Sequence, residues 1–232
     1  MENQNEINAD SLPHETNIVM DVPDCRDYDH EQLFWSTEWE DKIEFYPEHI
    51  QNQASFDDTH MACSRFGMTH WVNAQNRFVH WKDGMRFFEF PARNFWQQFI
   101  KINPKAKTEG ATLQSVLDQF LKLGLITGYS KTMTIESMKS ALSNIRPILT
   151  WSYNGNWVMV RDKKIYAVRT DWKTVGHIFV IVGYDNEGWI AINSYGANNG
   201  IFHIPYDLTD TLFTRYAISD SRDEETLKKF AN

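Results

Sequence analysis

The spacing of apolar residues along this chain is helical before residue 147 and strand-like after it. Three segments place apolar side chains three and four positions apart, which predicts amphipathic helices; they cover about residues 60–76, 111–123 and 134–145. Short runs rich in β-branched and aromatic residues then predict strands, at residues 148–153, 156–161, 164–169, 177–185, 188–196, 202–207 and 213–219. Helices followed by strands indicate an α+β fold, with a helical lobe at about residues 50–146 and a β lobe at about 147–220.

Local signals mark several ends of these elements. Thr59 or Asp58 can cap the first helix, and Gly124 follows the second helix as a natural stop. The turn sequence from Asp185 to Gly188 lies between two apolar runs. It therefore predicts that the fourth and fifth strands form a hairpin.

Composition narrows the class of protein. A net charge of -8, with no basic run interleaved with aromatics, argues against nucleic-acid binding. No apolar stretch approaches the roughly 20 residues of a membrane span. Residues 1–18 are polar and lack the basic start and apolar core of a secretion signal. We therefore expect a cytoplasmic or virion-associated protein, bacterial or viral, in which a protein partner holds this N-terminal arm and residues 19–232 form one domain.

Two cysteines, Cys25 and Cys63, are too few for a disulfide framework, which fits synthesis in a reducing compartment. Cys25 has no candidate catalytic partner nearby in the sequence, and we interpret it as structural. Cys63 lies about one turn into the first predicted helix. The positive end of a helix lowers the pKa of a thiol, which otherwise titrates at about 8.5.

A thiol that cleaves amides also needs a histidine held in one tautomer by a hydrogen-bonding partner. His177 opens the fourth predicted strand, where a side chain at the edge of the sheet can face a cleft. In the predicted hairpin Asn193 lies beside His177, and its amide oxygen can accept the ring N–H. The sequence therefore predicts a triad of Cys63, His177 and Asn193.

The residues around this triad resemble the papain family of cysteine peptidases. GHIFVIVGYD–EGWIAINSYG is similar to the family's Gly/Asn-His-Ala-Val, Val-Gly-Tyr and Trp-Leu-Ile-Lys-Asn-Ser-Trp-Gly pattern, including the step of sixteen residues from His177 to Asn193. QNQASFDDTHMACSRFG resembles the nucleophile segment, EGATLQSVLDQFLKLGLI the glycine and helix after it, and VPDCRDY the start of the mature domain. The similarity covers about residues 21–220 in the family's order.

The resemblance implies a two-lobed papain-like fold and an endopeptidase that acts on peptides or proteins without a metal or cofactor. Cys63 would attack the carbonyl, His177 would carry the proton, and Asn193 would hold His177. Gln53 would donate to the oxyanion beside the backbone N–H of Cys63.

Two further residues receive substrate-binding roles from the resemblance. Gly110 would let the substrate backbone approach and pair. Tyr195 stands where the family has the tryptophan that shields the His–Asn pair.

Several positions depart from the family's pattern. Gln53 lies ten residues before Cys63, where the family has six, so its oxyanion role depends on a four-residue insertion, and Gln51 is a weaker candidate for it. Ser64 replaces the tryptophan that follows the nucleophile, and the family's disulfide-forming cysteine is absent.

Three other interpretations stay open. An NlpC-type or bacteriocin-leader hydrolase has the same residue order, although Asn-Ser-Tyr-Gly favours papain. A non-catalytic papain-fold module, such as a virion component, fits the displaced Gln53 and the nearby acids Asp57 and Asp58, which would raise the pKa of the thiol. Metal ligation by Asp57, Asp58, His60 and Cys63 lacks the paired, tightly spaced ligands of a zinc site.

Overall fold

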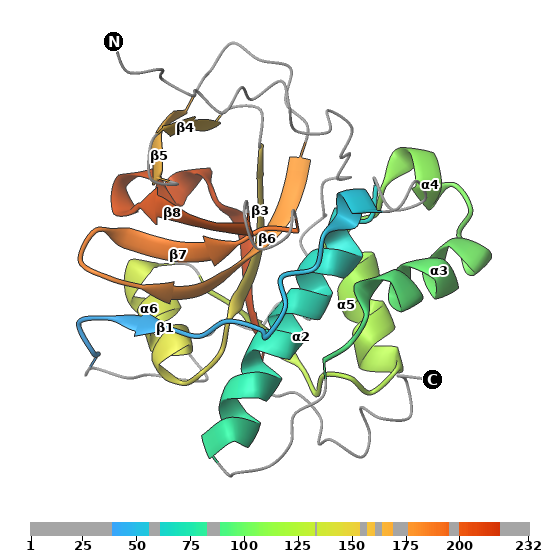
Figure 1. Cartoon of the computed structure of the whole chain (residues 1–232), viewed down its shortest axis with the longest axis horizontal. Helices are drawn as coiled ribbons and strands as arrows, with labels where there is room; N and C mark the ends of the chain where they lie inside the picture. Colours follow the sequence, from blue (N-terminus) through green and yellow to red (C-terminus); the bar gives the residue numbers. More distant parts are fainter. Residues whose placement is uncertain are drawn as a thin grey trace.

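The structure is a computed structural model, and it describes residues 39–55, 61–82, 89–132, 134–153, 157–160, 164–168, 176–194 and 200–218. Its helices are α2 (Cys63–Lys82), α3 (Ala92–Ile102), α4 (Ala106–Glu109), α5 (Leu113–Lys122) and α6 (Ile135–Ser143), with 3₁₀ turns η2 (Gln53–Ser55) and η4 (Tyr206–Thr211). Figure 1 shows α2 between the sheet and helices α3 and α5, whereas α6 lies beside the sheet. The predicted α+β class is confirmed.

The strands of the described residues form one sheet of nine. They are β1 (Ile43–Glu44), β2 (Tyr129–Lys131), β3 (Ile148–Tyr153), β4 (Trp157–Val160), β5 (Lys164–Val168), β6 (Gly176–Tyr184), β7 (Gly188–Ile192), β8 (Ile201–Pro205) and β9 (Phe213–Ile218). The strand order is β2-β9-β3-β6-β7-β8-β5-β4, and β1 pairs with the C-terminal end of β6. Every pairing is antiparallel except that of β5 with β8. Strand β6 therefore lies at the centre, and each of its nine residues is buried.

Local hydrogen bonds fix the starts of two predicted helices, and a glycine fixes the end of one of them. The hydroxyl of Thr112 accepts the backbone N–H of Ser115 at the start of α5. Thr134 and Ser137 form a reciprocal capping box at the start of α6. Gly124, with φ of 71°, ends α5 as predicted.

The start of α2 differs from the prediction. The carbonyl of Ala62 accepts the backbone N–H groups of Arg65 and Phe66, so the helix begins at Cys63 and not one turn earlier. The predicted caps, Thr59 and Asp58, lie outside the described residues. The expectation that Cys63 lies one turn inside the helix was therefore wrong, and the residue is closer to the positive end than expected.

Helix α2 packs closely against β6 because it has a glycine at the contact. A Cβ added to Gly67 would lie 2.6 Å from Cγ2 of Ile178. Gly67 is one turn after Cys63, and Ile178 follows His177 in β6. The close contact thus brings the start of α2 to the start of β6.

Several predictions fall on residues that the structure does not describe. These include the arm at residues 1–18 and the structural role of Cys25. The division into two lobes stays a prediction. Among the helices of the described ranges, none is both long and apolar enough to cross a bilayer.

Candidate active site

Cys63 lies at the junction of α2 and β6, and only 2% of it is exposed. Backbone N–H groups of Ile178, Ser64 and Cys63 itself are directed at its sulfur. The N–H of Ile178 belongs to the peptide bond that joins it to His177. The candidate nucleophile therefore lies beside the peptide bond that joins the candidate base to Ile178.

His177 and Asn193 are hydrogen-bonded at the ends of paired strands. The hairpin of β6 and β7 forms as predicted, with Val180 opposite Ile192 and the carboxylate of Asp185 accepting two backbone N–H groups in the turn. His177 is fully buried, and its Nε2 lies 2.5 Å from Oδ1 of Asn193. The predicted contact is confirmed, while the catalytic roles of the two residues stay predictions.

The hydrogen bonds around Asn193 identify the protonated nitrogen of His177. Oδ1 of Asn193 also accepts the backbone N–H of Ser194, at 2.7 Å, so this atom must be the amide oxygen. An oxygen facing Nε2 requires that Nε2 carry the proton. Nδ1 is then the ring nitrogen with the lone pair, and it is the one that can accept a proton from a thiol.

Gln53 joins the same cluster in spite of its longer spacing from Cys63. It is fully buried at the start of η2, and its backbone N–H donates to the carbonyl of Ser194 at 2.8 Å. The hydroxyl of Ser194 donates to Oε1 of Gln53. This bond directs the side-chain NH₂ of Gln53 away from Ser194, so that Nε2 is the atom that can donate to an oxyanion.

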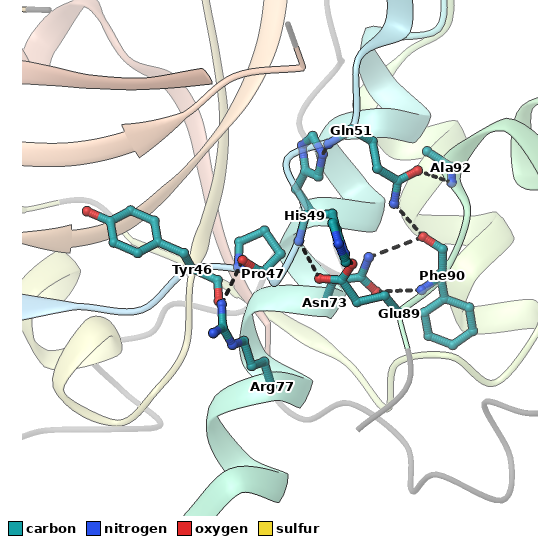
Figure 2. Close-up of polar contacts among 10 residues, drawn as sticks. Tyr46, Pro47, His49, Gln51, Asn73, Arg77, Glu89, Phe90 and Ala92 are labelled. Carbon is teal, nitrogen blue, oxygen red and sulfur yellow. Dashed lines mark hydrogen bonds and ion pairs between the residues drawn. The ribbon is translucent and has the colours of Figure 1, made fainter. Parts of the chain in front are cut away.

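Gln51, the weaker candidate for the oxyanion role, has a different task. Its side-chain amide donates to the carbonyl of Phe90 at 2.5 Å and accepts the N–H of Ala92 at 2.7 Å. Figure 2 shows this amide between Phe90 and Ala92. The structure thus favours Gln53 over Gln51 as the oxyanion donor.

Burial keeps the thiol of Cys63 and the imidazole of His177 uncharged. It raises the pKa of Cys63 to about 11, although backbone N–H groups oppose it. It lowers the pKa of His177 to about 4, opposed by the hydrogen bond to Asn193. At neutral pH the described state therefore contains a thiol and a neutral imidazole.

A buried cation lies close to the nucleophile on α2. The guanidinium of Arg65 is 3.2 Å from the centre of the Phe99 ring, and it donates to Oγ of Ser64 and Oε1 of Gln119. Its charge lowers the pKa of Cys63, but by less than burial raises it. Burial also lowers the pKa of Arg65 itself, to about 9.

The remaining predicted site residues are Gly110 and Tyr195. Gly110 ends α4 with φ of 74° and ψ of -154°, a conformation that requires glycine. Its contact with substrate stays a prediction, and Tyr195 lies outside the described residues. Within the described ranges no three His, Cys, Asp or Glu side chains are grouped as metal ligands. Three of the alternative metal ligands lie in the undescribed range 56–60, so that interpretation is not tested.

Sequence reasoning missed Ser194, which connects Gln53 to Asn193. Serine directly after the asparagine is part of the quoted Asn-Ser-Tyr-Gly motif, so the signal was available in the sequence. Gly67 was also missed, because nothing local shows that a helical glycine faces a strand.

The fold resembles solved cysteine proteases. Xylellain, a cysteine protease from Xylella fastidiosa, is 19% identical, with a TM-score of 0.66 over 96% of this chain and 99% of that one. Procathepsin B S9 from Trypanosoma congolense is 11% identical, with a TM-score of 0.67 over 94% and 89%. Digestive procathepsin L 3 from the midgut of Tenebrio molitor larvae is 12% identical, with a TM-score of 0.58 over 90% and 77%. No family model and no curated protein matches the chain. The chain has the papain-like cysteine protease fold.

Proposed function

We propose that this protein is a cysteine peptidase in which Cys63 is the nucleophile, His177 the base and Asn193 the residue that orients the base. The observation that carries the proposal is the hydrogen bond from Nε2 of His177 to the amide oxygen of Asn193. It fixes the tautomer in which Nδ1 can accept the thiol proton, and the sulfur of Cys63 lies beside the backbone N–H of Ile178, the residue that follows the proposed base.

In the proposed reaction the sulfur of Cys63 bonds to the carbonyl carbon as Nδ1 of His177 takes the thiol proton. The proton then passes to the leaving amine, the C–N bond breaks, and a thioester remains. Water attacks the thioester, its proton passes through His177 to the sulfur, and the carboxylic acid product leaves. Nε2 of Gln53 and the backbone N–H of Cys63 would stabilise the oxyanion, and one such donor is worth roughly 10²–10³-fold in rate.

Labelling of the intact protein with an epoxysuccinyl cysteine-peptidase inhibitor at neutral pH tests this proposal. We expect one adduct per chain, mapped to Cys63, in the wild type. Cys63→Ala should abolish it, and His177→Ala should slow it strongly, because the thiol then has no base. Folding of each variant is checked by tryptophan fluorescence. Equal labelling of the wild type and His177→Ala would refute the proposed base.

The burial of Cys63 favours a second candidate function, that of a papain-fold module without peptidase activity. A thiol that is 2% exposed, with its pKa raised to about 11, is inert in the described state. A folded protein that forms no inhibitor adduct, but whose Cys63 reacts slowly with a small alkylating agent, would support this second candidate.

A further inference from the structure

Between β1 and the bridge at Asn52, the segment that carries Gln53 does not belong to a strand of the described structure. Residues 46–53, here called the Gln53 segment, run from the end of β1 to η2. Backbone hydrogen bonds hold the chain at both ends of this segment. Before it, the N–H of Phe45 donates to the carbonyl of Val182 at 3.0 Å, and at its end the N–H of Gln53 donates to the carbonyl of Ser194. Between these ends, side chains from other elements bind the backbone.

Two of these side chains come from one face of α2, two turns apart. Nη1 of Arg77 donates to the carbonyls of Tyr46, at 3.3 Å, and Pro47, at 2.9 Å. Nε2 of His70 accepts the backbone N–H of Gln51 at 2.9 Å. Figure 2 shows Arg77 reaching Tyr46 and Pro47 from α2. The helix that begins with Cys63 thus also holds the Gln53 segment.

A second set of bonds ties the same segment to residues 89–92. The carboxylate of Glu89 accepts the backbone N–H of His49 at 2.9 Å and lies 2.8 Å from its ring Nδ1. Asn73 of α2 accepts the N–H of Phe90 at 3.0 Å and donates to its carbonyl at 3.2 Å. These contacts surround Gln51 in Figure 2. Arg77 and Glu89 bind farther from Gln53, so among the side chains that bind the backbone of this segment from α2 and residues 89–92, His70 lies nearest to Gln53 in the sequence.

We propose that His70 is a positioning residue, which fixes the backbone at Gln51 and thereby sets the place of the Gln53 side-chain amide. The proposal rests on the peptidase function proposed above. His70 is fully buried in the middle of α2, and Gln51 is two residues from Gln53. An oxyanion donor must be placed accurately, because a displacement of about 1 Å can reduce a rate about 10²-fold.

The chemistry of His70 suits a permanent acceptor. Burial lowers the pKa of His70 to about 3, so the ring is neutral at neutral pH. Accepting at Nε2 requires the tautomer with its proton on Nδ1. A leucine of similar size would remove the acceptor of the half-buried Gln51 N–H, whereas a glutamine oxygen can reach the same position.

Gln75 offers a matched control on the same helix. It is 3% exposed, and its amide donates to the backbone carbonyl of Ile145 at 3.1 Å. Gln75→Leu therefore removes one buried bond from a side chain of α2 to a distant backbone group, without touching the Gln53 segment.

The test compares two rates at Cys63. Hydrolysis of a peptide amide passes through an oxyanion, whereas alkylation by iodoacetamide does not. We expect His70→Leu to lower kcat/KM for a fluorogenic peptide amide by about 10- to 100-fold with unchanged alkylation. His70→Gln should restore most of the hydrolysis, and Gln75→Leu should change neither rate. An equal fall of both rates in His70→Leu, or the same selective loss in Gln75→Leu, would overturn the proposal.

A second readout separates this proposal from the proposed function. The side-chain NH₂ signals of Gln53, assigned with Gln53→Glu in ¹⁵N NMR spectra, should move in His70→Leu but not in Gln75→Leu. If the wild type does not hydrolyse peptides while these signals move, the peptidase function fails and the positioning by His70 stands. Unmoved signals overturn the positioning whatever the activity. If His70→Leu does not fold, His70→Asn, whose amide is too short to reach the Gln51 N–H, takes its place.

Discussion

Acidification should destabilise this fold through two buried histidines, and replacement of His70 should remove about half of that effect. Burial lowers the pKa of His70 to about 3 and that of His177 to about 4. In the unfolded chain a histidine titrates at about 6.5. The native state therefore binds fewer protons than the unfolded state below that value, and the free energy of unfolding falls as the pH decreases.

The size of the effect follows from the difference between the two pKa values. At pH 5 each unfolded histidine is about 1.5 pH units below its pKa, whereas the native ring is still neutral. Each therefore removes roughly 2 kcal/mol between pH 7 and pH 5, and the pair removes roughly 4 kcal/mol. This is a large part of the roughly 5–15 kcal/mol that stabilises a typical domain.

Urea unfolding at pH 7 and at pH 5, followed by tryptophan fluorescence, measures this difference in the wild type and in His70→Gln. Glutamine does not titrate, and it can still accept the N–H of Gln51. We expect the two histidines to account for a loss of roughly 4 kcal/mol in the wild type, and the single one left to account for roughly 2 kcal/mol in the variant. Taking the difference within each protein removes any effect of the substitution on packing. A variant that loses as much stability as the wild type would refute the reasoning.

Three further changes test other parts of the structure. Ser194→Ala removes the hydroxyl that orients Gln53, so kcat/KM for a peptide amide should fall about tenfold while alkylation of Cys63 is unchanged; a parallel fall of both rates would contradict this. Gly67→Ala places a Cβ 2.6 Å from Ile178, so urea unfolding should show a loss of about 1–2 kcal/mol, because overpacking outweighs the better helix propensity of alanine. Arg65→Met removes a cation whose pKa burial lowers to about 9, so the free energy of unfolding at pH 7 should rise by about 1–3 kcal/mol. A lower urea midpoint would contradict this, because it would show that the stacking and hydrogen bonds of Arg65 outweigh its desolvation.

The parts of the site that the sequence predicted depend on local pattern. The contact between His177 and Asn193 follows from two apolar strands and a four-residue turn, because an antiparallel hairpin necessarily brings its outer ends together. The helices around Leu113 and Ile135 follow from spacing and from caps at Thr112 and Thr134. In each case the residues that decide the structure lie within about twenty positions of one another.

The parts that were missed or left in doubt depend on contacts between distant segments. The role of Gln53 was in doubt because of its spacing from Cys63, and the structure brings it to Ser194, far along the chain, through backbone and side-chain bonds. His70 lies within the helix predicted at residues 60–76, but its bond to Gln51 depends on how a non-regular segment crosses that helix. Helix α3 is a different case, because its apolar residues recur at helical spacing in the sequence, although no helix was predicted there.

The burial of the site sets a condition on the proposed catalysis. Burial raises the pKa of Cys63 to about 11 and lowers that of His177 to about 4, so moving the proton from sulfur to nitrogen is unfavourable in the described state. In the proposed peptidase, Cys63 must therefore be exposed to water or substrate before the ion pair forms. The structural alternative makes no such demand, because there the thiol stays buried. The alkylation rate of Cys63 therefore separates the two: a peptidase should react faster when a peptide substrate analogue or mild urea opens the site, and a structural module should react only as it unfolds.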